Sequence, residues 1–171
     1  MPKTPTPPPF PPVVAHLTVH DCDAAIAFYK KAFGAVELLR HAAPDGKKIM
    51  HATFTVLGHP VMINDDFPEY TGKPQTPRAL GGSPVTLHLS VPDVDAAWQK
   101  AVKAGAEVTM PLADQFWGDR YGKLRDPFGH EWSLSANKNK KLSDAEIRKG
   151  AEKAFGKPRA TPAAKAAKRG R

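Results

Sequence analysis

Three histidines, His16, His51 and His88, stand at positions where their side chains could do chemistry. The imidazole pKa lies close to neutral pH, so a histidine in a pocket can act as a general base, bind a ligand or hold a metal. The sequence contains no Ser-His-Asp pattern, phosphate-binding loop or Cys-x-x-Cys pair. His51 is therefore the candidate for acid–base chemistry, with a structural role beside a threonine or a backbone carbonyl as the alternative.

Strand alternation predicts that these histidines share one type of surface. In residues 48–57 the apolar side chains alternate with His51, Thr53 and Thr55, which must point to the opposite side. The segments around His16 and His88 show the same alternation. We expect one pocket lined by the polar sides of these segments and by the last hairpin: His16, Thr18, His51, Thr53, Thr86, His88, Trp117, Tyr121, Glu131 and Ser133.

Other reactive residue types have simpler interpretations. Trp117 and Tyr121 could stack on a planar ligand, although a tryptophan in a domain of this size is more often part of the core. Arg120 and Arg125 fall on opposite strand faces, and we expect surface ion pairs for both. We expect His130 to frame a turn. Cys22 is expected to make a small apolar contact at a helix start.

The elements that position these residues occur twice. The segments 16–25 and 88–97 match at a constant offset of 72 residues. In both, an alternating strand leads to an aspartate and then to apolar residues spaced at i, i+3, i+4, i+7 and i+8, which predicts a helix. Gly34 and Gly105 end the two helices.

Three strands are predicted after each helix. They cover 36–41, 48–57 and 60–64 in the first copy, and 107–110, 119–126 and 131–136 in the second. The sequence therefore predicts an α+β fold of two βαβββ modules, at about 13–70 and 83–137. We expect their mixed sheets to pair around a central cavity, with the helices on the outer faces.

The last hairpin carries the most distinctive strings, ADQFWGDR at 113–120 and DPFGHEW at 126–132. With residues 13–136 as a whole, they resemble the vicinal-oxygen-chelate superfamily of glyoxalases, bleomycin-resistance proteins and extradiol dioxygenases, and above all its PhnB-like branch. The resemblance implies the paired-module fold and a homodimer. It leaves the reaction open, because one fold hosts many functions.

The resemblance also implies where metal ligands would stand. The positions of the glyoxalase-type ligands fall on Val14, Ile63 or its neighbour Asn64, Thr86 and Ser133. Valine, isoleucine, threonine and serine are poor ligands for a divalent metal, so we expect no metal of this type. The alternative is a shifted site that holds a divalent metal with His16, His88 and Glu131.

The net charge of +8 comes from the end of the chain. Residues 138–171 hold 12 Lys and Arg against 3 Asp and Glu, whereas the remainder is close to neutral. We expect a basic tail with a short helix over 143–155, which makes at most non-specific contacts with nucleic acid. Proline fills 7 of the first 12 positions, so we expect residues 1–12 to form a disordered leader.

Two function classes remain after these exclusions. The chain has no long apolar run, no secretory leader and a single cysteine, which favours a cytoplasmic protein without a membrane segment. We expect a small-molecule-binding protein without a firm cofactor requirement. A metal-dependent lyase, isomerase or dioxygenase-like enzyme is the alternative.

Overall fold

The computed structural model describes residues 11–138 and 141–156. The expected leader at 1–12 therefore falls outside the described residues except for its last two, and so does the basic segment 157–171.

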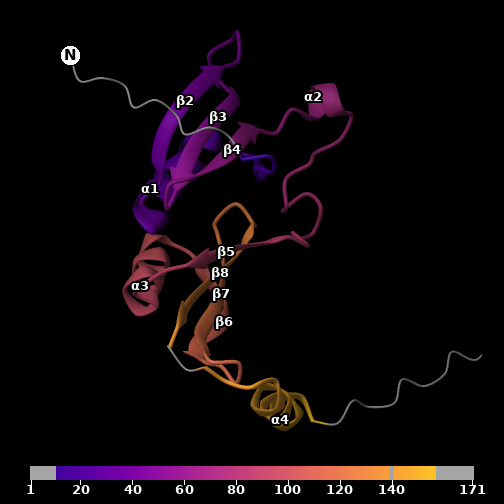
Figure 1. The fold of residues 1–171 in the computed structure, drawn as a ribbon. Coiled ribbons are helices and arrows are strands. Elements are labelled where there is room, and N and C mark those ends of the chain that lie inside the picture. The colour runs from indigo at the N-terminus through magenta and orange to yellow at the C-terminus, as the bar shows by residue number, and fades with distance from the viewer. Residues whose placement is uncertain (1–10, 139–140, 157–171) are drawn as a thin grey trace, which may run out of the picture.

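Two modules of equal connectivity form the fold (Figure 1). The first contains β1 (His16–Val19), α1 (Cys22–Phe33), β2 (Val36–Ala42), β3 (Ile49–Val56) and β4 (His59–Asp65). The second contains β5 (Thr86–Ser90), α3 (Val94–Ala104), β6 (Glu107–Asp114), β7 (Asp119–Arg125) and β8 (Glu131–Asn137). The short α2 (Pro68–Thr71) lies in the connection, and α4 (Asp144–Phe155) follows the second module.

Each module builds one four-stranded mixed sheet. The strand orders are β1-β4-β3-β2 and β5-β8-β7-β6, which are the same order in the two copies. The first strand of each sheet pairs in parallel with the last one, and the other neighbours are antiparallel. The α+β fold with two βαβββ modules is thus confirmed.

The two helices begin and end as their sequences predict. Asp21 and Asp93 cap α1 and α3, each accepting a hydrogen bond from the backbone N–H three residues later. Gly34 and Gly105 close the same helices in the left-handed conformation, which costs glycine little because it lacks a Cβ.

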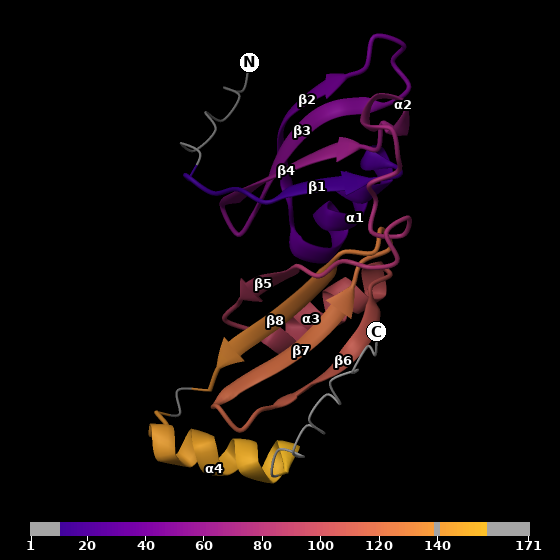
Figure 2. The same cartoon turned by 90° about the vertical axis from the view of Figure 1, so that its right-hand side faces the viewer.

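The helices of the two modules also pack against each other. α1 and α3 each lie on one face of their own sheet and are in contact at the junction of the modules, a contact that the expected arrangement did not include (Figure 2). The cause is the width of the apolar surface on α1. Six of its residues are buried, and they cover more than one stripe: Cys22, Ala25, Ile26, Phe28, Tyr29 and Ala32. One sheet cannot cover so wide a surface, and α3 covers the remainder.

A buried carboxylate joins the two modules. Asp126, in the turn between β7 and β8, accepts a hydrogen bond of 2.7 Å from the Tyr29 hydroxyl and one of 2.9 Å from the Trp132 indole. The backbone N–H groups of Phe128 and His130 donate to its other oxygen, both at 2.9 Å. Aromatic rings surround this network, and Phe54 stacks on Tyr29 at 5.1 Å between centroids.

Strand alternation predicts the faces of β3 only in part. Ala52, Phe54 and Val56 are buried as expected, but Met50 is 48% exposed and Thr53 is fully buried. Met50 stands at a register shift, since His41 pairs with His51 and Ala42 with Ile49, and this irregularity interrupts the alternation. Thr53 is covered because β2 and β4 flank the centre of β3 on both sides.

The C-terminal helix docks on the turn between β6 and β7 (Figure 2). It begins with a complete capping box between Ser143 and Glu146, as the sequence predicts. The Phe155 ring meets Phe116 edge-on at 5.8 Å. A Cβ at Gly150 would come within 2.7 Å of the Phe116 Cβ, so only glycine allows this approach.

A membrane-spanning helix is not found among residues 11–138 and 141–156, since none of the helices there is both long and apolar enough.

Candidate functional site

The open face of the first sheet, on the side opposite α1, carries a group of histidines. The rings of His16 and His51 meet edge-on with centroids 5.8 Å apart, and His41 stacks at 6.5 Å from His51. The His51 Nε2 lies 3.2 Å from the Thr53 hydroxyl. Partial burial lowers the pKa of His51, and the neighbouring His16 and His41 lower it further. His51 is therefore mostly neutral at pH 7, the state in which an imidazole can accept a proton or a hydrogen bond.

The open face of the second sheet holds a more strongly oriented histidine. The Nδ1 of His88 lies 2.8 Å from the Ser133 hydroxyl, and its Nε2 lies 3.3 Å from Ser90 and 3.2 Å from Ser135. Because both ring nitrogens are matched by hydroxyls, the imidazole is fixed in one orientation. A hydroxyl can donate or accept, so this group can adapt to either kind of polar ligand atom.

Aromatic side chains border His88. Tyr121 stacks on it with centroids 6.1 Å apart, and Trp117 meets Tyr121 edge-on at 5.7 Å. Trp117 is half-buried and lies outside the hydrophobic core. The core role that is more usual for a tryptophan does not apply to Trp117, and the row of rings continues through Phe116, 4.9 Å from Trp117, to the C-terminal helix.

The expectation that three histidines converge on one concavity is wrong for a single chain. His16 and His51 are in contact on the first sheet, whereas His88 is bound to serines of the second. The reason is the helix packing described above. α1 and α3 pack together at the junction, and the two groups of histidines belong to two separate sheets.

The shifted metal site is not assembled either. Glu131 accepts a hydrogen bond from Arg125 at 2.8 Å and one from Thr109 at 3.3 Å. No group of three histidine, cysteine, aspartate or glutamate side chains suited to a metal ion occurs in the described part of the chain. His16, His88 and Glu131 thus do not come together within one chain, because they are divided between the two sheets.

The remaining expected pocket residues also divide between the sheets. The Thr18 hydroxyl lies 3.5 Å from Asn64 on the first sheet, and Thr86 stands opposite Glu131 in the register of the second. Arg120 forms ion pairs with Asp95 and Asp114, so the expected surface role of this arginine is confirmed.

Cys22 is confirmed as an apolar contact. It is fully buried at the start of α1. Burial, with a smaller contribution from nearby Asp65, raises the pKa of its thiol to about 12. A thiol with such a pKa carries almost no thiolate at neutral pH and is a poor nucleophile.

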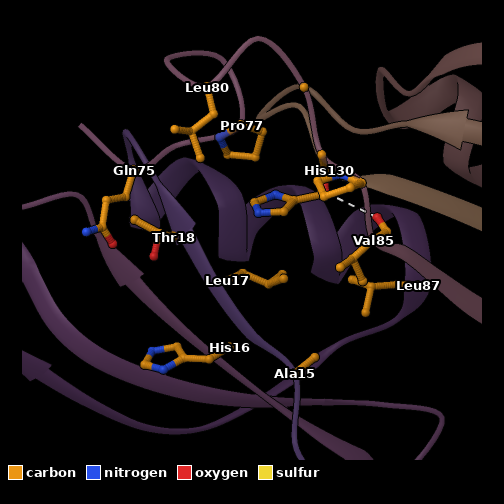
Figure 3. A pocket seen from close by; sticks show the side chains of 13 residues that line it. Ala15, His16, Leu17, Thr18, Gln75, Pro77, Leu80, Val85, Leu87 and His130 are labelled. Atoms are coloured by element: carbon orange, nitrogen blue, oxygen red, sulfur yellow. Dashed lines mark hydrogen bonds between the residues drawn. The ribbon is translucent and has the colours of Figure 1, made fainter. Parts of the chain in front are cut away.

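Sequence reasoning missed a cavity of about 360 Å³ between β1 and the connection at residues 75–87 (Figure 3). His16 and Thr18 border it, and the His130 ring points into it. The position of His130 next to a tight turn suggested only a framing role. The sequence holds no signal for this cavity, because the burial of Asp126 beside His130 becomes visible only in the structure.

Comparison with known proteins relates this geometry to a family. The sequence profile of the Glyoxalase/Bleomycin resistance protein/Dioxygenase superfamily matches residues 12–134. An uncharacterized protein of Mycobacterium tuberculosis is 58% identical over 120 residues, which are 70% of this chain and 70% of that protein.

Solved structures give the same relationship. TioX from Micromonospora is 32% identical with a TM-score of 0.57, covering 73% of this chain and 97% of TioX. A PhnB protein from Bacillus cereus is 20% identical with a TM-score of 0.57, covering 74% of this chain and 99% of that one. At this identity the second match shows a common fold, in agreement with the PhnB-like resemblance of the sequence.

Proposed function

Because this chain belongs to the glyoxalase/bleomycin resistance protein/dioxygenase superfamily, we propose that it binds a small organic molecule on the open faces of its two sheets. The observation that carries the proposal is the arrangement around His88. Its imidazole is fixed by three serine hydroxyls and lies beside the rings of Tyr121 and Trp117. A few fixed polar groups next to aromatic surface are typical of small-molecule sites.

A second copy of the chain would complete this site. Neither open face is enclosed within one chain, and among the described strands β1 and β5 pair on one edge only. We call the face with His16, His41 and His51 the histidine face, and the face with His88 and Tyr121 the serine–aromatic face. In a homodimer, the histidine face of one copy and the serine–aromatic face of the other can enclose a ligand together. Unpaired strand edges favour such an association.

The residue types favour binding over metal-dependent catalysis. Val14, Ile63, Thr86 and Ser133 occupy the positions of the glyoxalase-type ligands, and their side chains offer no strong donor to a divalent metal. We place the protein in the cytoplasm, which agrees with a single, buried cysteine.

The test uses 8-anilinonaphthalene-1-sulfonate, a fluorescent aromatic probe with one polar group. We expect saturable binding to the full chain, weakened about tenfold by Trp117→Ala through the lost stacking contact. Tyr70→Ala removes an aromatic ring that is 85% exposed and should leave binding unchanged. If the Trp117→Ala variant bound the probe as tightly as the unaltered chain, binding on the proposed face would be contradicted.

Light scattering tests the assembly. The expected mass is twice the chain mass of 18.5 kDa. A mass of one chain at micromolar concentration would refute the shared site, while saturable probe binding to that monomer would leave a binding function on a single face.

A further inference from the structure

We propose that the cavity between β1 and the connection at 75–87 is a second binding site, apart from the face around His88, although His16 and Thr18 of the first sheet border it. Its ligand is a small apolar molecule with an acidic hydroxyl group, such as a phenol, and the hydroxyl donates a hydrogen bond to His130.

The cavity has the form of a ligand site. Its volume of about 360 Å³ falls within the range of small-molecule pockets. Leu17, Leu80, Val85 and Leu87 provide apolar walls around the His130 ring (Figure 3). A ligand here would be bound mainly by apolar contact, with one polar anchor.

The connection that forms one wall is fixed by its own hydrogen bonds. The Gly82 N–H donates to the Pro77 carbonyl at 2.8 Å, and the Arg78 guanidinium donates to the Pro127 carbonyl at 2.7 Å. Pro77 also approaches Gly129 so closely that a Cβ there would come within 2.9 Å of it. The wall is thus tied to the turn that carries His130, and the cavity is preformed.

The Nδ1 of His130 is a buried nitrogen without a hydrogen-bond partner. The His130 side chain is 10% exposed, and its Nδ1 is buried 3.7 Å from the Asp126 Oδ2. That distance is too long for a hydrogen bond. A ligand that donates to the other ring nitrogen, Nε2, would hold the imidazole in place with Nδ1 toward Asp126.

Asp126 determines which ring nitrogen of His130 can accept a hydrogen bond. Burial alone would raise the pKa of this carboxyl, but interactions with His130, Tyr29 and Trp132 outweigh it and hold the pKa below the usual value. A charged carboxylate facing Nδ1 favours the proton on that nitrogen. The lone pair then sits on Nε2, on the opposite side of the ring, toward the cavity. A group that donates, such as a hydroxyl, is therefore the matching ligand chemistry.

The experiment compares 4-nitrophenol with 4-nitroanisole by calorimetry on the full chain. The two molecules share a ring and a nitro group, but only the phenol can donate. At a pH that keeps the phenol protonated, we expect it to bind about tenfold more tightly than the ether, the factor for one hydrogen bond in a buried site.

Two variants locate the site. His130→Leu removes the acceptor and keeps the apolar volume, so the two ligands should bind equally. Leu80→Trp, a change in an exposed wall residue, fills the cavity and should abolish binding of both even if His130→Leu fails to fold. His59→Leu, at an exposed histidine of β4, is the matched control and should change neither affinity.

Three results would overturn the proposal. They are no binding of 4-nitrophenol by the unaltered chain, equal affinity for phenol and ether, or a preference for the phenol that survives Leu80→Trp. Loss of phenol binding in Trp117→Ala instead would assign the ligand to the sheet faces, which separates this inference from the function proposed above.

Discussion

The two modules share one topology but differ in how far their helices are buried. α1 buries six of its residues, including Ile26 and Tyr29, which are at most 1% exposed. α3 buries only Val94 and Ala101. The positions that correspond at the offset of 72 show the cause, since Tyr29 is matched by Ala101. The first helix therefore fills the centre of the molecule, and the second one covers it.

The polar faces of the two sheets also differ between the modules. The first sheet presents histidines that contact one another, and the second presents one histidine held by serines beside aromatic rings. A duplicated scaffold has thus kept its strand order while its open faces acquired different chemistry. Stability and recognition are unevenly divided between the copies.

The largest expected effect comes from the carboxylate that joins the modules. Asp126→Ala should lower the free energy of unfolding by about 4 kcal/mol, because it leaves the Tyr29 hydroxyl and the Trp132 indole buried without an acceptor. Urea unfolding followed by circular dichroism measures this change. Asp95→Ala, which removes an exposed partner of Arg120, should have little effect, and a similar loss in both variants would contradict the special role of Asp126.

The same carboxylate predicts that the free energy of unfolding decreases at low pH. The pKa of Asp126 is lower in the folded chain than the roughly 3.9 of an unfolded aspartate. The contribution of Asp126 to the free energy of unfolding is therefore fully present above pH 4. It is lost as the pH falls through the lower pKa of the folded state. Asp126→Asn should flatten this part of the stability profile. An unchanged acid slope in Asp126→Asn would show that other carboxylates cause it.

A substitution in each helix tests the uneven burial directly. Ile26→Ala in α1 should cost about 3 kcal/mol, since it opens a cavity in the core. Val102→Ala in α3 should cost less than about 1 kcal/mol, because Val102 is already 38% exposed. Comparable losses in denaturant titrations would mean that both helices stabilise the fold equally.

Gly150→Ala tests the docking of the C-terminal helix. Alanine favours the helix itself by roughly 1 kcal/mol, but its Cβ would collide with Phe116. We expect a small net change in stability together with a shifted Trp117 indole signal in the NMR spectrum. Lys149→Ala, at the exposed neighbouring position, should leave that signal in place.

The smallest effect concerns the histidine face. His16→Gln removes the neighbour that helps to lower the pKa of His51, so the pKa of His51 should rise toward its usual value. NMR titration of the imidazole signals measures the shift. His59→Gln is the control, and an equal rise in both variants would exclude a direct effect of His16.

The sequence predicted the elements of this fold because their signals are local. The aspartate caps, the closing glycines and the capping box at Ser143 act within a few residues and can be recognised without a structure. The helix contact was missed because a wide apolar surface on α1 does not tell whether a sheet or another helix covers it.

For the candidate site, the sequence indicated strand faces but not their arrangement in space. Alternation placed His51 and His88 on polar faces, yet it gave no information on the relative orientation of the two sheets. The partners of Asp126 were missed because Tyr29 lies 97 positions away in the chain. The DPFG string indicated the turn and left the burial of its aspartate unknown.

That long separation also bears on how the chain is made. The first module leaves the ribosome complete, but its helix cannot cover its apolar side until α3 and the turn at Asp126 have been synthesised. A nascent chain with apolar surface exposed for this interval is prone to association with other chains. We therefore expect the first module alone to associate with other chains, and this exposure to end only when β8, which carries Trp132 of the Asp126 network, has been added.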